Sequence, residues 1–211
     1  ILEEPFIIHG VASRRQRVEE VKGLLKVVGL DLPSLDKYPH QFSGGQRQRI
    51  AVARALALKP QLIVADEPVS ALDVSVQAQI ISLFEELQAQ YNLTYLFISH
   101  GIPVVEYISH TIGVMYLGKL VEVGNCSEIA ENPLHPYTQI LLASVPVLNR
   151  TEPRGTTYLE GEVPSPINPP SGCRFHSRCP FVMERCKSEV PKEIHVTRTH
   201  WVSCHLIDEK G

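Results

Sequence analysis

The chain has 211 residues, of which 44% are hydrophobic and 20% are charged, a composition typical of a folded domain with an apolar core. A formal net charge of −3 at pH 7 provides no electrostatic attraction to nucleic acid or to anionic lipid. No apolar run approaches the roughly 18 residues of a membrane-spanning helix, and the opening ILEEPFIIHG lacks the basic and then apolar order of a signal peptide.

The N-terminal part predicts an amphipathic helix over residues 13–28. Ser13 is placed to cap its start, and Gly29 to end it. Four apolar residues recur along it at helical spacing: Val18, Val21, Leu25 and Val28.

Apolar strands then alternate with helices. LIVAD, residues 62–66, is a continuous apolar run of the kind found in strands buried on both faces, and TYLFIS, residues 94–99, is a second one. The pattern between them predicts a helix over residues 75–90. Further on, the sequence predicts a helix over 102–109, a hairpin over 111–124 that turns at Gly118-Lys119, and a helix over about 127–144. This order is typical of an α/β sheet that is parallel in its core.

The character changes after Val145. Residues 146–170 carry six prolines, which favour an extended, stiff linker. Residues 171–211 contain four of the five cysteines and predict a compact Cys/His-rich tail. Without a secretion signal we expect a reducing compartment, where clustered thiols indicate a metal before they indicate disulfides.

The stretch FSGGQRQR, residues 42–49, predicts a helix start that is open to an anion. Ser43 lies three residues before Gln46, which is the spacing of a capping box. Gly44 and Gly45 then form the first turn, where backbone N–H groups and the helix dipole attract negative charge. The alternative is a simple capped helix after a flexible loop, in which alanine at either position would add ~1 kcal/mol of stability.

Two carboxylates, Asp66 and Glu67, stand where the strand LIVAD ends. The carboxyl ends of parallel strands are where α/β proteins bind ligands. Asp66 suits Mg²⁺, held directly or through water, and Glu67 is placed to polarise an attacking water. The alternative is an acidic pair that only begins a polar turn before Pro68.

His100 follows the next strand and is therefore expected at the same sheet edge. It can hydrogen-bond a γ-phosphate or orient the attacking water. A lone histidine after a strand is more often structural or solvated, but an edge shared with Asp66 and Glu67 favours a functional role.

Residues 38–100 resemble the second half of the nucleotide-binding domain of ABC transporters. YPHQFSGGQRQRIAVARAL resembles the signature motif with its helix, and LIVADEP the Walker B strand with its catalytic glutamate. SALD, residues 70–73, resembles the D-loop, and Ser99-His100 the switch histidine. The match extends over most of residues 1–145, with one departure at position 101, where glycine replaces the acidic residue that is common in the family.

The resemblance implies an α/β fold, a partial P-loop NTPase domain with a helical subdomain that contacts the membrane permease, plus a small Cys-rich C-terminal extension. Residues 1–58 would be the helical subdomain with the signature motif. Residues 59–145 would be the C-terminal half of the RecA-like ATPase core, and residues 146–211 the proline-rich linker and the extension.

The resemblance also implies a dimer in which each ATP lies between the P-loop of one subunit and the signature motif of the other. It assigns nucleotide binding to Ser43, Gly44, Gly45, Gln46, Asp66 and Asp73, and catalysis to Glu67 and His100, with Asp66 on Mg²⁺. The sequence contains no Gly-x-x-x-x-Gly-Lys-Ser/Thr loop, and the family's glutamine loop would precede Ile1. We therefore expect a fragment of a complete ATPase that is inactive alone.

The tail narrows the resemblance to the ATP-binding subunits of dipeptide/oligopeptide (peptide/nickel) importers, through GEVPSPINPPSGCRFHSRCPFVMERC and HWVSCH. Its cysteines are Cys173, Cys179, Cys186 and Cys204. Four thiolates can hold a [4Fe–4S] cluster or a Zn²⁺ ion, and the absence of tight Cys-x2-Cys pairs favours iron–sulfur. Four free cysteines are the alternative.

We therefore expect an ATPase subunit that powers peptide import at the cytoplasmic face of the inner membrane. Its partners would be a second ATP-binding subunit, identical or related, two transmembrane permease subunits and, indirectly, a solute-binding protein, with no nucleic acid. Two alternatives stay open: an ABC ATPase outside transport, and a metal-binding module that only completes its partner's site.

Overall fold

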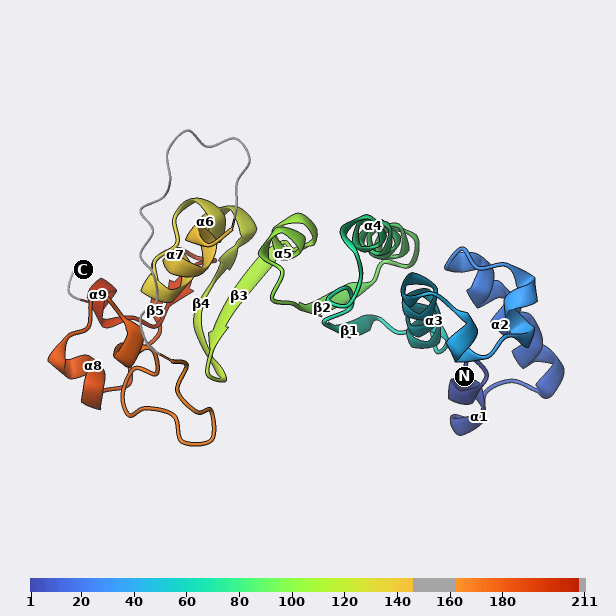
Figure 1. The fold of residues 1–211 in the computed structure, drawn as a ribbon, viewed down its shortest axis with the longest axis horizontal. Coiled ribbons are helices and arrows are strands. Elements are labelled where there is room, and N and C mark those ends of the chain that lie inside the picture. Colours follow the sequence, from blue (N-terminus) through green and yellow to red (C-terminus); the bar gives the residue numbers. More distant parts are fainter. Residues whose placement is uncertain (146–161, 209–211) are drawn as a thin grey trace. The chain divides into compact units, whose positions relative to one another are not determined.

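The computed structural model describes residues 1–145 and 162–208 of the chain, drawn in colour in Figure 1. The chain divides into two compact units, Ile1–Val104 and Val105–Gly211, called unit 1 and unit 2 below. Each unit has its own hydrophobic core and is described by itself.

Unit 1 begins with helices. These are α1 (Glu4–Ile8), α2 (Arg14–Val27) and α3 (Gly44–Leu56), with short 3-10 turns at Leu32–Asp36 and Pro39–Gln41. The predicted start and end of α2 are confirmed: Ser13 and Gln16 form a capping box, and Gly29 follows the helix with a positive φ of 70°. The buried face of α2 is the predicted one and includes Val21 and Leu25.

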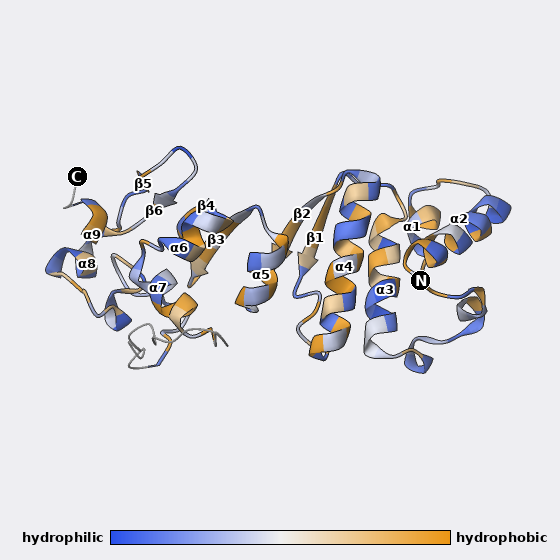
Figure 2. Ribbon diagram, turned by 90° about the horizontal axis from the view of Figure 1, so that it is seen from above, coloured by the Kyte–Doolittle hydropathy of each residue, from blue (hydrophilic) through white to orange (hydrophobic). Residues whose placement is uncertain are grey.

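The second half of unit 1 contains β1 (Leu62–Asp66), α4 (Val74–Tyr91) and β2 (Thr94–Ile98). The two strands pair in parallel, as predicted, and Phe84 of α4 packs edge-on against Tyr95 and Phe97 of β2. Figure 2 shows α4 beside this pair of strands, with apolar residues at intervals along the helix.

The prediction that LIVAD is buried on both faces is wrong. Burial alternates along β1, where Leu62 is 54% exposed and Val64 is 58% exposed. Along β2, exposed residues alternate with half-buried ones. Within the described residues of unit 1, α4 covers one face of a two-stranded sheet, so only every second residue of each strand is covered.

Unit 2 is built on an antiparallel sheet. The helix α5 (Ile102–Ile108), whose first three residues belong to unit 1, precedes β3 (Thr111–Tyr116) and β4 (Lys119–Asn125), which form the predicted hairpin. Its turn residues are Leu117 and Gly118, both with positive φ, so the turn lies one residue earlier than predicted. The expected parallel core is therefore limited to β1 and β2.

The predicted helix over 127–144 is two helices, α6 (Cys126–Glu131) and α7 (Pro136–Ala143). Pro133 and Pro136 lie at the break, because proline lacks the N–H that a continuous helix would need there. Most of the predicted proline-rich linker, residues 146–161, lies outside the described residues.

The C-terminal tail joins the hairpin sheet. Its elements are α8 (Glu184–Ser188), β5 (Ile194–His195), β6 (Trp201–Val202) and α9 (His205–Asp208). The strand order is β3-β4-β6-β5, all antiparallel. Phe175 is buried against Tyr116 of β3 and Tyr137 of α7, so the tail shares the core of unit 2.

Candidate functional site

The start of α3 has the geometry that its sequence predicts. The Ser43 hydroxyl accepts a hydrogen bond from the Gln46 N–H at 3.3 Å, and the Gln46 side-chain oxygen accepts one from the Ser43 N–H at 3.0 Å. The capping box is therefore confirmed. Ser43 and Gln46 are exposed, and the first-turn glycines between them are half-exposed. The turn is accessible to an anion, although its use as an anion site stays a prediction.

The expected acidic and histidine side chains meet at the edge of the β1–β2 sheet. Asp66 ends β1 in register with Ile98, the last residue of β2. Glu67 follows with a positive φ of 46°, and its N–H donates to the Ile98 carbonyl at 2.8 Å. This turn brings the Glu67 carboxylate to His100, with 2.9 Å between Oε1 and Nδ1.

The electrostatics of this edge keep Glu67 ionised. The hydrogen bond with His100, followed by one with Ser70, lowers the pKa of Glu67 below its ordinary value. The two side chains are well exposed, at 45% for Glu67 and 74% for His100. At neutral pH Glu67 is therefore a solvent-accessible carboxylate that can accept a hydrogen bond from water, with an imidazole fixed beside it.

Asp73 has a local role that the sequence reasoning missed. Its carboxylate caps α4 by accepting hydrogen bonds from the Val76 N–H at 3.0 Å and the Ser75 hydroxyl at 2.7 Å. These bonds, that from Ser75 first, lower the pKa of Asp73. An aspartate just before a helical pattern is the ordinary signal of such a cap, so the residue is held in place independently of any nucleotide.

The two predicted groups are each formed, but no side-chain hydrogen bond links them. Ser43 bonds with Gln46, and Glu67 bonds with His100, and within residues 1–145 and 162–208 no side-chain hydrogen bond joins one group to the other. The one near match to a phosphate-binding loop, GVMYLGKL at 113–120, forms the β3–β4 hairpin instead of a strand, a loop and a helix.

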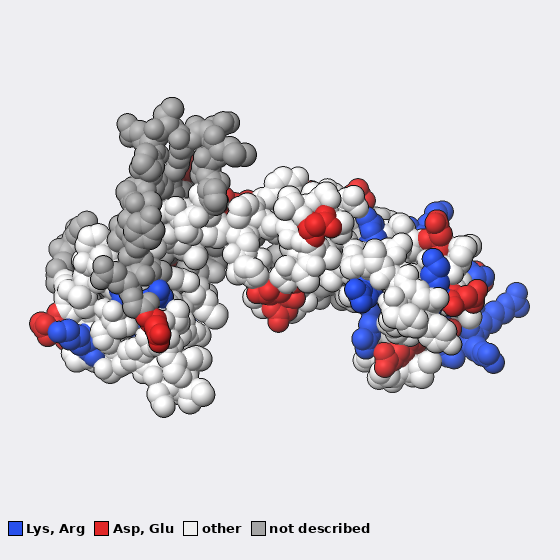
Figure 3. Space-filling model, viewed as in Figure 1, with Lys and Arg blue, Asp and Glu red and all other residues white. Residues whose placement is uncertain are grey.

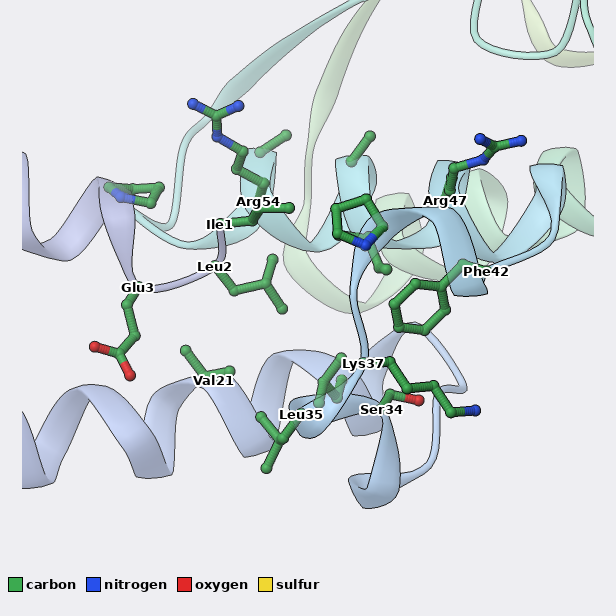
Figure 4. Close-up of a pocket in the computed structure, with 16 residues that line it drawn as sticks. Ile1, Leu2, Glu3, Val21, Ser34, Leu35, Lys37, Phe42, Arg47 and Arg54 are labelled. Atoms are coloured by element: carbon green, nitrogen blue, oxygen red, sulfur yellow. The ribbon is translucent and has the colours of Figure 1, made fainter.

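A groove of about 1030 Å³ lies among the helices of unit 1. Leu2, Val21 and Phe42 point into the space between α2 and α3, and Arg47 and Arg54 lie along its α3 side (Figure 4). Over this end of unit 1, lysines and arginines are interspersed with carboxylates (Figure 3). The groove is therefore an apolar recess within a surface of mixed charge.

The four C-terminal cysteines lie on the loops and the short helix α8 of the tail. Cys186 and Cys204 are buried, and the Cys173 N–H donates to the Cys186 carbonyl at 2.9 Å. Burial, with a smaller contribution from the other three thiols, raises the pKa of Cys204 to about 11. Among the described residues, no three or more His, Cys, Asp or Glu side chains are arranged to hold a single metal ion.

A buried polar group in unit 2 was not foreseen. Glu122 of β4 is fully buried, and its Oε1 lies 2.8 Å from Nε2 of His200, which is buried as well. The same carboxylate accepts the N–H groups of Leu134 at 2.7 Å and His135 at 3.0 Å. This contact joins β4, the start of α7 and the tail. The only signal in the sequence was a glutamate inside an apolar strand.

Comparison with known proteins identifies both parts of the chain. Residues 2–70 match the family "ABC transporter", and residues 121–186 match the family "Oligopeptide/dipeptide transporter, C-terminal region". No described helix is long and apolar enough to cross a bilayer.

Relatives match nearly the whole chain. The Oligopeptide transport ATP-binding protein AppF of Bacillus subtilis is 55% identical over 98% of this chain, and the Di/tripeptide transport ATP-binding protein DppF of Pseudomonas aeruginosa is 48% identical over 99%. The chain spans 63% and 64% of the length of these two proteins.

Part of the chain has the fold of a solved ABC cassette. The dimeric structure of MJ0796, a bacterial ABC transporter cassette, matches with a TM-score of 0.52 at 31% identity, over 59% of this chain and 54% of that one. The same values hold for its post-hydrolysis state bound to ADP and Pi. Residues 2–70 are therefore similar to the ABC transporter family, and residues 121–186 to the C-terminal region of oligopeptide/dipeptide transporters.

Proposed function

We propose that the chain is part of an ATP-binding subunit whose ATP hydrolysis drives the import of dipeptides or oligopeptides. The observation that carries this proposal is the meeting of Asp66, Glu67 and His100 at one edge of a parallel sheet. The names of the relatives, which are peptide transport ATP-binding proteins, supply the solute class.

The exposed carboxylate of Glu67 would orient and polarise the water that attacks the γ-phosphate. His100 holds that carboxylate through its Nδ1 at 2.9 Å, and its imidazole would be free to turn toward the phosphate once nucleotide is bound. Asp66, at the end of β1, is an oxygen donor of the kind that Mg²⁺ takes, and the ion would neutralise charge on the phosphates.

The capped start of α3 would serve the second nucleotide of a dimer. Its exposed Ser43 hydroxyl and the N–H groups of Gly44 and Gly45 are suited to a phosphate, and the solved cassette with the same fold is dimeric. Gln46 would stabilise this turn through its bond to Ser43. Asp73, fixed as a helix cap beside the turn, would face the same partner subunit.

The remaining partners follow from the peptide importer assignment. Unit 1 would dock on two transmembrane permease subunits at the cytoplasmic face of the membrane, and a solute-binding protein would deliver the peptide to them. The groove lined by Val21 and Phe42 is an apolar surface that suits such a contact. In this proposal residues 1–58 are the helical subdomain, 59–145 belong to the ATPase core and 146–211 form the extension.

The test is the Glu67→Gln variant of the full-length subunit, assembled with its partner ATPase and permease. Glutamine keeps the size of the side chain but lacks the negative charge, so ATP turnover should fall by about 10²–10⁴-fold while ATP binding is retained. Steady-state hydrolysis and nucleotide binding are measured on the same preparation.

Glu86→Gln is the matched control, because Glu86 is an exposed glutamate on α4, outside the sheet edge. It should hydrolyse ATP and import peptide like the wild type. Unchanged hydrolysis by Glu67→Gln would contradict the role given to Glu67. Hydrolysis without uptake of any dipeptide or oligopeptide would contradict the transport assignment.

We also propose that Cys173, Cys179, Cys186 and Cys204 hold a [4Fe–4S] cluster, with Zn²⁺ as the competing occupant. Four cysteines within the short tail support this, since four thiolates can hold either group, and Cys186 and Cys204 are buried. When bound, the cluster would cross-link the segments that carry these four cysteines. Iron and sulfide analysis of anaerobically purified full-length protein tests it: four irons per chain are expected, and zinc or no metal would contradict it.

A further inference from the structure

Gly45 has no room for a side chain in this fold. A Cβ atom added there would lie 2.6 Å from Cγ1 of Val76, in the first turn of α4. One added at Gly44 would lie 3.1 Å from Cδ2 of Leu72. The two glycines therefore allow the start of α3 to pack closely against residues 72–76.

The side chain that fills this space is held rigidly. Valine is branched at Cβ and has one strongly preferred rotamer in a helix, so Cγ1 of Val76 cannot readily swing away. The Val76 N–H is bound by Asp73, and the side chain of Gln77 donates to the Leu72 carbonyl at 2.9 Å. Residues 72–77 are thus fixed by their own hydrogen bonds.

The same segment is tied to the catalytic edge of the sheet. The Ser70 hydroxyl donates to the backbone carbonyl of Glu67 at 3.1 Å, so the turn that leads to Leu72 and Val76 begins at the proposed catalytic residue. On the other side of the contact, the capping box fixes Ser43 relative to Gly45. The contact between Gly45 and Val76 is therefore a direct steric link between the two groups that no hydrogen bond joins.

We propose that Val76 is a positioning residue, whose side chain sets where the Ser43 hydroxyl and the first-turn N–H groups of α3 stand. This inference rests on the proposed function. Under that function, the start of α3 binds the partner's nucleotide, and the sheet edge with Glu67 hydrolyses the chain's own. The distance between the two is fixed because the start of α3 packs directly against Val76.

The experiment is a size exchange in the full-length subunit, assembled with its partner ATPase and permease. Gly45→Ala should push the α3 turn away from Val76 and lower kcat/KM for ATP by at least about tenfold, since a misplacement of about 1 Å can cost about 10²-fold. Val76→Ala in addition removes Cγ1 and reopens the space, so the double variant should recover most of the loss. Val76→Thr, which keeps the shape of valine, should not rescue Gly45→Ala.

Melting temperatures test whether Val76 fills the space at position 45, independently of any effect on ATP hydrolysis. Alanine is the better helix former, so Gly45→Ala should raise the melting temperature if the space is open and lower it if Val76 fills it. If the wild type hydrolyses ATP but the double variant is as impaired as Gly45→Ala, the positioning role of Val76 is contradicted and the proposed function is not. A wild type that hydrolyses no ATP contradicts the proposed function itself, whatever the melting temperatures are.

Discussion

Two pairs of glutamate and histidine in this chain have nearly the same geometry and opposite surroundings. In unit 1, Glu67 and His100 lie 2.9 Å apart, with 45% and 74% of their side chains exposed. In unit 2, Glu122 and His200 lie 2.8 Å apart, with 0% and 3% exposed. The distance within a pair therefore says little about its role, whereas the access of water to it says a great deal.

The exposed pair can part and reform at little cost, because water replaces the lost hydrogen bond. The buried pair cannot, because separating its members leaves polar groups unsatisfied in the core. The exposed pair suits a site that must admit water and phosphate. The buried pair suits a stabilising contact between distant chain segments. Substitutions at Glu122, His135 and Glu67 test this contrast, in order from the largest expected effect on stability to the smallest.

The largest effect is expected for Glu122→Ala. The change leaves His200 and the N–H groups of Leu134 and His135 without their buried acceptor, so unfolding should become easier by about 3–5 kcal/mol. Thermal melts of the full-length protein measure it. Glu131→Ala, at an exposed glutamate of α6, is the control and should melt like the wild type. An unchanged melting temperature for Glu122→Ala would show that the buried pair does not stabilise the fold.

His135 should make unit 2 sensitive to acid. Burial lowers its pKa from 6.5 to about 4, so the unfolded chain binds a proton between these values that the folded chain does not. Stability from this group is complete above pH 6.5 and is lost as the pH falls toward 4, by about 3 kcal/mol in total.

In the wild type, the His135 Nδ1 accepts a hydrogen bond from the Tyr137 N–H at 3.0 Å. His135→Asn removes the titrating imidazole and keeps a side-chain oxygen that can accept the same bond. The variant should show a flatter dependence of melting temperature on pH between 4 and 6.5 than the wild type. The same slope in both proteins would show that His135 titrates normally when the chain is folded.

The sequence predicts local features well. The capping box of Ser43 and Gln46, the hairpin of β3 and β4, and the shared edge of Glu67 and His100 all follow from residues close together or from a repeated strand–helix order. Each depends on spacing that a single stretch of chain displays.

Features that depend on distant neighbours were missed. An apolar run such as LIVAD tells what a strand can bury, but not that β1 has a helix on only one of its faces. Glu122 and His200 are 78 residues apart, and nothing near either residue indicates the other. The contact between Gly45 and Val76 is hidden for the same reason, since glycine shows only that a side chain is absent.

The most direct measurement compares Glu67→Gln with Glu122→Ala in the full-length complex, recording ATP turnover and melting temperature for each. We expect Glu67→Gln to lose turnover and to melt like the wild type, and Glu122→Ala to melt at a clearly lower temperature. If Glu67→Gln keeps its turnover, or melts as early as Glu122→Ala does, the exposed pair is not the catalytic one.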